Sequence, residues 1–386
     1  MQKKLMAVAV AGALAAPAVA LAQSTVQVYG NFYIEHSFVK EGANAAGTID
    51  PANADVLQAG GSAIGFKGQE KLGGGMSAWF QCESTADMRG ASGSSNGFCS
   101  RDSAVGLKGG FGNVFLGTWG TPFKRARVGN VGGRDTGVFG TAFLMYGNST
   151  TVADGANTGV FSRRQRNSIN YDSPNFGGFQ FMASTTSTNS STATTTTSSG
   201  AKPRVWSLAG VYKQGPLALS AAYEKHSKFV GANGAPGAFS GDEEGYLLAG
   251  AYTFGTVKFG GTYTQQKSET AAALTGKVKA YHLGAEWHIA GPHNLHFGYT
   301  RADDIDGAAG ASLGVGSRPV STGLSDTGAS LWQLRYVHNL SKRTTVSLGY
   351  VALRNDTNAT YDLGGVSGTG AGAKSHAIAY SIQHKF

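Results

Sequence analysis

The sequence predicts an all-β fold, a sixteen-stranded antiparallel transmembrane β-barrel, on three observations. Glycine makes up 58 of the 386 residues, 15%, and charged residues only 14%, against usual shares of about 7% and about 25%. Long segments alternate apolar and polar residues with a period of two, as half-exposed strands do. Short and long connections between these segments alternate along the chain, as they do between the two ends of a membrane barrel.

The composition excludes other classes. With 41% hydrophobic residues, the chain can bury enough surface to fold, so the composition disfavours disorder. Collagen is excluded because glycine has no period of three and there are only nine prolines. The abundance of glycine, threonine and aromatic residues disfavours a helical bundle.

The first 22 residues have the layout of a secretory signal peptide. Lys3 and Lys4 precede an Ala-rich apolar run over 5–21, and Ala20-Leu21-Ala22 is a small-x-small cleavage site before Gln23. An uncleaved membrane anchor is the alternative. We expect one domain over 23–386. It has no apolar stretch of 18 residues, so any crossing of a membrane would be made by strands.

The faces of the strands indicate which side meets lipid. Near the C-terminus Ile378, Tyr380 and Ile382 alternate with Ala379, Ser381 and Gln383. Such strands suit a barrel with an apolar outside in lipid and a polar lumen in water. A sheet in lipid must close on itself because every backbone group has to be paired, and sixteen strands leave an aqueous lumen.

The same alternation locates every strand in order. The predicted spans are 24–41, 58–71, 76–86, 101–110, 113–120, 163–173, 178–188, 204–213, 217–229, 244–254, 256–268, 277–290, 294–303, 329–340, 344–355 and 374–386. All eight prolines beyond the signal peptide fall between these spans, where no ladder hydrogen bond is needed. Aromatic residues near strand ends are expected to form interface girdles, among them Tyr29, Trp79, Phe80, Tyr171, Trp206, Trp287 and Tyr299. The Ser/Thr tract 184–200 is expected to be a strand end followed by an exposed loop.

Several stretches together resemble the general trimeric porins of Gram-negative outer membranes, of the Neisseria and Burkholderia kind. They are STVQVYG at 24–30, GFKGQEKLGGGMSAWFQ at 65–81, SAVGLKGGFGNVFLGTW at 103–119, RNSINYDSPNFGGF at 166–179 and the terminal HKF. The resemblance implies a passive diffusion channel for ions and small hydrophilic solutes in the outer membrane. It also implies a homotrimer in a bilayer with lipopolysaccharide, and a long third loop, here 121–162, folded into the lumen. Phe386 matches the C-terminal aromatic that the barrel-assembly machinery reads.

The resemblance also implies a basic pore constriction. Arg166 matches the wall arginine of the Arg-Asn-Ser motif, and Arg164 has the same parity. Arg101 matches a second wall arginine. Ala63 replaces the usual arginine before Gly-Phe-Lys-Gly, a loss for which Lys67 can partly substitute. A solvated rim charge is the alternative for each arginine.

The predicted third loop contains few acids to neutralise these cations. Asp135 and Asp154 are its only carboxylates, beside Lys124, Arg125, Arg127 and Arg134. Because a basic constriction lowers the barrier for anions, we expect small anions as the preferred permeants, unless Asp135 turns toward the wall and cancels a charge.

Cys82 and Cys99 are the only cysteines, at the two ends of the second long loop. An exported chain passes an oxidising compartment, and the paired strands of a hairpin would bring the two close enough for a disulfide. Free thiols are the alternative.

Other motifs are weak. Two G-x-S-x-G matches, at 93–97 and 310–314, lie outside any strand-to-helix context. His282, Glu286 and His288 lack zinc spacing. We therefore expect no catalytic residue, cofactor or metal site, and the basic balance of an exported chain does not indicate nucleic acid. An outer-membrane barrel enzyme of the esterase or phospholipase kind remains the alternative function; a Ser with a His and an acid in reach would indicate it.

Overall fold

The computed structural model describes residues 26–48, 53–89, 97–147, 161–186, 204–227, 242–269, 275–307, 325–363 and 370–386. The predicted signal peptide, 1–22, and most of the Ser/Thr tract lie outside these residues. No helix within the described ranges is long and apolar enough to cross a membrane.

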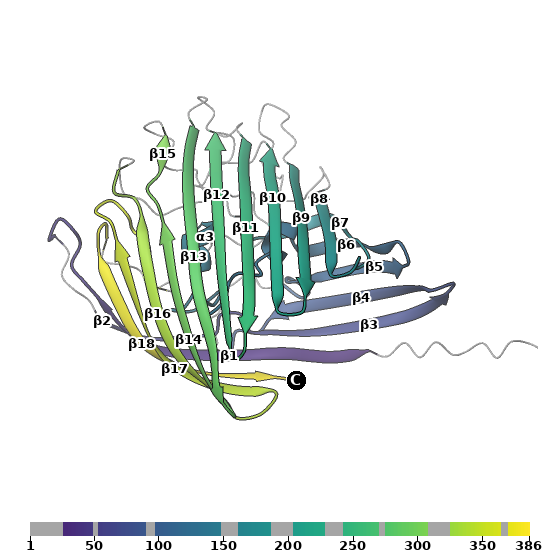
Figure 1. The fold of residues 1–386 in the computed structure, drawn as a ribbon, viewed down its shortest axis with the longest axis horizontal. Coiled ribbons are helices and arrows are strands. Elements are labelled where there is room, and N and C mark those ends of the chain that lie inside the picture. The colour runs from purple at the N-terminus through teal and green to yellow at the C-terminus, as the bar shows by residue number, and fades with distance from the viewer. Residues whose placement is uncertain are drawn as a thin grey trace, which may run out of the picture.

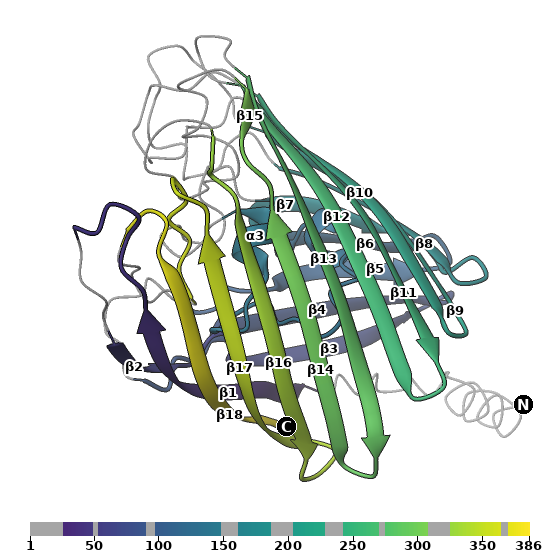
Figure 2. The same ribbon diagram turned by 60° about the vertical axis from the view of Figure 1, so that its left-hand side comes forward.

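The described chain forms one closed antiparallel barrel of sixteen long strands (Figures 1 and 2). They are β1 (Gln27–Glu41), β3 (Ala63–Gly73), β4 (Met76–Thr85), β5 (Ser103–Gly109), β6 (Gly112–Gly120), β7 (Arg164–Asp172), β8 (Phe179–Thr186), β9 (Arg204–Gln214), β10 (Leu217–Ser227), β11 (Asp242–Phe254), β12 (Val257–Glu269), β13 (Thr275–Ala290), β14 (His293–Ala302), β16 (Ala329–Asn339), β17 (Thr344–Asn355) and β18 (Lys374–Lys385). Each pairs with its neighbour along the chain, and β1 pairs with β18 in register from Asn31↔Lys385 to Glu41↔Ser375. This confirms the predicted fold class.

Two short strands were not predicted. Strand β2 (Asn53–Gln58) lies in the first long connection and pairs with the second half of β1, while β3 pairs with the first half. Strand β15 (Asp306–Gly307) pairs with the start of β13. Both extend the sheet at its loop end without adding a long strand to the barrel.

The two faces of the barrel differ as the alternation predicts. Large apolar side chains point outward and are exposed in the isolated chain, among them Val105, Leu116, Ile169, Leu248, Leu283, Leu348 and Ile378. Residues of the other parity face inward and include buried polar groups such as Glu35, Ser207, Glu224, Gln266, Gln333 and Arg335. The outside suits lipid, and the inside carries the polar chemistry.

The third loop joins β6 to β7 and enters the barrel. Its described residues include two short helices, α2 (Pro122–Arg125) and α3 (Ala142–Tyr146). The Thr121 hydroxyl caps α2 by accepting from the Lys124 amide, and Pro122 opens the helix. Apolar loop residues such as Phe123, Phe139 and Leu144 are fully buried against the wall, so the loop is packed like a core.

Candidate functional site in the lumen

The third loop is hydrogen bonded to one side of the barrel wall. The Phe123 amide donates to Ser207 Oγ of β9 at 3.0 Å. Farther along the loop, the Met145 carbonyl accepts from Thr264 Oγ1 (2.9 Å) and Gln266 Nε2 (2.8 Å) of β12. The Val138 amide donates to Glu35 Oε1 of β1 at 2.8 Å. These contacts hold the loop against β9, β12 and β1.

Close backbone contact at two glycines makes this attachment tight. Gly132 has φ +76°, and a Cβ there would lie 2.0 Å from the Phe297 carbonyl oxygen of β14. A Cβ at Gly129 would lie 1.9 Å from the Gly261 carbonyl oxygen of β12. Only glycine fits both positions, and the loop backbone therefore lies directly on the wall.

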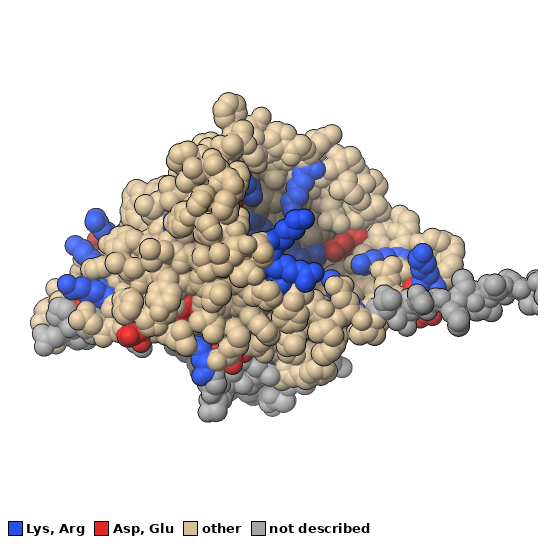
Figure 3. Space-filling view, turned by 90° about the horizontal axis from the view of Figure 1, so that it is seen from below, with Lys and Arg blue, Asp and Glu red and all other residues tan. Residues whose placement is uncertain are grey.

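The opposite wall, β3 to β7, remains open and lines a cavity of about 630 Å³ between wall and loop. Its lining is mostly polar or aromatic and includes Gln27, Lys67, Gln69, Trp79, Gln81, Lys108, Asn113, Phe115, Trp119, Arg125 and Asp172. Seen from below, the side of the turn joining β9 to β10, the barrel is hollow, with many basic and fewer acidic side chains gathered at the opening (Figure 3). The described residues thus leave a cavity between this wall and the third loop.

Two of the predicted wall arginines are paired with carboxylates. Arg101 Nε lies 2.6 Å from Glu83 Oε1 of β4, and Arg164 Nε lies 3.0 Å from Asp102 Oδ1 just before β5. The Tyr29 hydroxyl also donates to Glu83, at 3.1 Å. Because each arginine faces its own carboxylate, this part of the wall is nearly neutral.

Arg166 lies in an irregular part of β7. Gly117 pairs with Ser168 and Trp119 with Gln165, so Arg166 and Asn167 together oppose one residue of β6 in a β-bulge. Asn167 has φ +52°. The bulge shifts the alternation, and Gln165 and Ser168 on either side of it are buried. The Arg166 side chain is half-exposed and has no hydrogen bond or ion pair with the described residues.

Two basic residues of the third loop, Arg125 and Arg127, also pair with carboxylates. Arg127 Nη1 lies 3.2 Å from Asp135 Oδ1, and the Arg127 guanidinium lies 3.8 Å from the centre of the Tyr146 ring. Burial raises the pKa of the Tyr146 phenol to about 12, so this ring stays neutral beneath the cation. Arg125 makes a bidentate pair with Asp172, at 2.9 and 2.7 Å. Asp135 thus pairs within the loop.

Two lysines of the open wall are likewise without an ion pair. Lys67 Nζ lies 5.0 Å above the Tyr29 ring, and Lys108 Nζ lies 4.9 Å above the Trp79 ring. Both lysines are exposed in the lumen, and within the described part of the chain neither is ion-paired. Of these, Lys67 was predicted from the sequence and Lys108 was missed. Its parity with Gly106 and Ala104, which face the lumen, is the signal that could have identified it.

The expected place of Trp79 and Tyr29 in outer girdles is wrong. Trp79 is only 9% exposed and donates from Nε1 to Asn113 Oδ1 at 2.7 Å, inside the barrel. Tyr29 faces the lumen toward Glu83. Trp79 shares the parity of Gln81 and Glu83, so its own strand already indicated the polar face.

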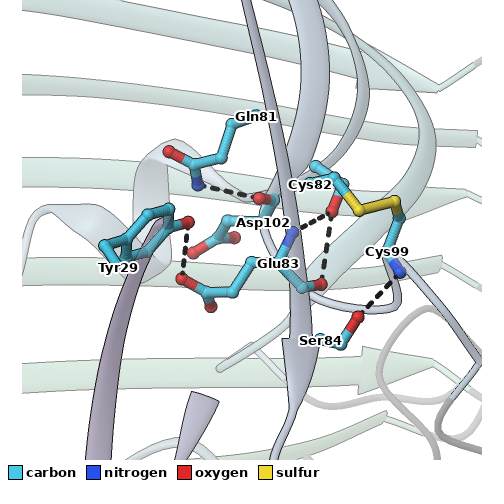
Figure 4. Close-up of a disulfide and its surroundings, with 8 residues drawn as sticks. Tyr29, Gln81, Cys82, Glu83, Ser84, Cys99 and Asp102 are labelled. Carbon is cyan, nitrogen blue, oxygen red and sulfur yellow. Dashed lines mark hydrogen bonds between the residues drawn. A yellow bond between two sulfur atoms is a disulfide. The ribbon is translucent and has the colours of Figure 1, made fainter. Parts of the chain in front are cut away.

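The Cys82–Cys99 disulfide is present, with the two Cα atoms 4.7 Å apart. Figure 4 shows it on one side of β4, with Glu83 and Tyr29 on the other. The Cys99 amide donates to Ser84 Oγ at 2.9 Å. The bridge closes the second long loop beside the Arg101–Glu83 pair.

Comparison with known proteins places this lumen among bacterial outer-membrane channels. Residues 7–358 match the Gram-negative porin family. The chain is 28% identical over 394 residues to outer membrane porin protein 32 of Delftia acidovorans, covering all of both chains. It is 39% identical over 120 residues to major outer membrane protein P.IB of Neisseria gonorrhoeae, covering 31% of this chain and 30% of that one.

The comparison with solved structures agrees with these sequence matches. An anion-selective porin from Comamonas acidovorans superposes with a TM-score of 0.72 at 25% identity, covering 94% of this chain and 100% of that one. The trimer form of OmpT from Vibrio cholerae superposes with a TM-score of 0.63 at 17% identity, covering 94% and 99%. At that identity the second likeness concerns the fold alone.

Proposed function

The chain belongs to the Gram-negative porin family, and we propose that this outer-membrane channel prefers small anions. Passive conduction, rather than catalysis, is what the family and the full-length relative indicate. The observation that carries the anion preference is unpaired positive charge in the lumen, above all at Lys67 and Lys108 on the open wall. A similar structure is that of an anion-selective porin, which supports the same direction.

Ion pairing decides which cations act. Arg101 and Arg164 each face a carboxylate within 3.0 Å, so their fields largely cancel at the distance of a passing ion. Charges farther than about 8 Å from the path are screened at physiological salt. The two lysines lie on the cavity wall itself, and Asp172, the carboxylate among the lining residues, is already paired with Arg125.

The test is the reversal potential of the purified protein in a planar bilayer under a KCl gradient. A potential that indicates a higher permeability for Cl⁻ than for K⁺ supports the proposal. A pore that favours K⁺ overturns it.

The assembly remains a proposal of the same kind. We expect a homotrimer in a lipopolysaccharide-containing outer membrane, after export by residues 1–22 and insertion by the barrel-assembly machinery. The Phe386 ring packs at 5.2 Å from Phe32 at the β1–β18 junction, where a C-terminal signal would be read as the barrel closes. Detergent-purified protein that runs as a monomer both before and after crosslinking contradicts the trimer.

A further inference from the structure

The open wall carries an aromatic cluster that the conduction of small ions does not require. Trp79 of β4 and Phe115 and Trp119 of β6 have ring centres 5.2 to 5.7 Å apart in tilted or edge-to-face contact. Phe115 is buried beneath the other rings, whereas Trp119 is half-exposed and lines the cavity. Apolar ring surface in a water-filled lumen is unfavourable unless something covers it.

A glycine in the strand between β4 and β6 lets the aromatic rings of those strands come into contact. Strand β5 lies between β4 and β6, and Gly106 is the residue beneath the cluster. A Cβ at Gly106 would lie 2.6 Å from both Phe115 Cβ and Trp79 Nε1. Trp79 is also fixed by its bond to Asn113. The rings therefore form a fixed surface across three strands.

Positive charge borders this surface. Lys108 Nζ lies 4.9 Å above the Trp79 ring, and Lys67 lines the same cavity from β3. Neither lysine is ion-paired with the described residues, whereas Arg125 in the same cavity is already paired with Asp172. A cavity of about 630 Å³ is within the range of small-molecule pockets.

We propose that Trp79, Phe115, Trp119, Lys67 and Lys108 form a binding subsite for aromatic carboxylates, which we call the aromatic subsite. It rests on the proposed anion channel and names a class of solute for it. The ring of the solute stacks on the cluster, offset or edge-on as aromatic pairs prefer, and its carboxylate pairs with a lysine ammonium. An aliphatic carboxylate lacks the first contact, and a neutral arene lacks the second.

The probe is benzoate, with acetate and benzyl alcohol as controls for charge alone and for the ring alone. Single-channel KCl current is recorded while each is titrated in. Benzoate should reduce the current with a saturating concentration dependence, over a range where acetate and benzyl alcohol leave it unchanged. Equal effects of benzoate and acetate overturn the aromatic subsite.

Variants separate the subsite from the channel. Trp119→Ala should weaken the benzoate effect roughly tenfold, since a tenfold change corresponds to about 1.4 kcal/mol and aromatic pairs contribute on that order. Lys108→Gln should weaken it several-fold. Trp206→Ala, which removes an outward-facing indole, should leave it unchanged.

The outcomes distinguish the two proposals. A pore that favours Cl⁻ but responds to benzoate as to acetate overturns the aromatic subsite alone, and a pore that favours K⁺ overturns the anion channel. If Trp119→Ala does not insert, Trp119→Leu and Lys108→Gln decide; a benzoate effect unchanged in both overturns the aromatic subsite.

Discussion

Arg101 and Glu83 form an ion pair, 2.6 Å from Nε to Oε1, and each lies one or two residues after a cysteine of the disulfide. Glu83 is next to Cys82 in the chain, and Arg101 is two residues beyond Cys99. The Arg101 amide also donates to the Glu83 carbonyl at 2.8 Å. The disulfide thus fixes the backbone from which both charged side chains extend into the lumen.

The double variant Cys82→Ser/Cys99→Ser should be less stable than the parent. Closing a loop with a sequence separation of 17 is worth about 3 kcal/mol in the entropic model. The midpoint of urea unfolding of the detergent-folded barrel measures the loss, and reduced parent protein is the control. Two reactive thiols in denatured, unreduced parent would show that the bond is absent.

Removing unpaired charges from the lumen should affect selectivity more than removing an ion pair. The double variant Lys67→Gln/Lys108→Gln removes two uncompensated charges and should move the KCl reversal potential toward K⁺. The matched double variant Arg101→Gln/Glu83→Gln removes an ion pair and should move it little. A larger shift in the second variant than in the first would contradict the assignment of the selectivity to the two lysines.

Arg166→Ala tests the arginine predicted from the Arg-Asn-Ser motif. We expect a smaller anion preference, because this side chain has no ion pair within the described chain. The reversal potential of the variant is compared with that of the parent in the same KCl gradient. Identical potentials would mean that the bulge turns Arg166 away from the ion path.

Gly132→Ala should displace the third loop. Its new Cβ would collide with the Phe297 carbonyl oxygen, and φ at this position is +76°. Phe297 belongs to the hydrogen-bonded wall, so we expect the loop to shift into the lumen and single-channel conductance to fall. Gly177→Ala is the control, with φ +63° but open space around its Cβ. Equal conductance in Gly132→Ala and the parent would contradict the attachment described above.

His226→Ala should destabilise the barrel behind the third loop. The imidazole lies between Glu224 (2.8 Å) and Glu243 (3.0 Å), all three buried, and stacks on Phe161. Removing one partner leaves carboxylates buried without it, which typically costs about 3–5 kcal/mol. Thermal unfolding measures the change, with His384→Ala on the exposed turn side as the control. A midpoint equal to that of the control would show that the cluster contributes little.

Strand positions could be predicted because each depends on its own residues. Alternation and turn glycines are local, and for β17 the predicted and observed spans coincide at residues 344–355. The pairing state of the arginines could not be predicted in this way. Arg164 meets Asp102 across 62 positions of the chain, and only the closed barrel brings the two together.

Two further features depend on geometry that the alternation does not encode. The bulge at Arg166 and Asn167 interrupts the alternation of β7, and the residue types in this stretch do not predict a bulge. The aromatic cluster joins β4 to β6 across a glycine of β5, a contact between strands that are not neighbours. Trp79 was misplaced because its type suggested an interface, while its parity indicated the lumen.

The pairing of β1 with β18 constrains how the barrel can fold. The seam joins residues 31–41 to residues 375–385, so the contact that closes the sheet has nearly the largest sequence separation in the chain. Until it forms, both edge strands expose unpaired backbone groups, which lipid does not tolerate and which invite pairing with other chains. The open sheet is therefore unfavourable in lipid, and we expect both edges to need protection until β18 has paired with β1.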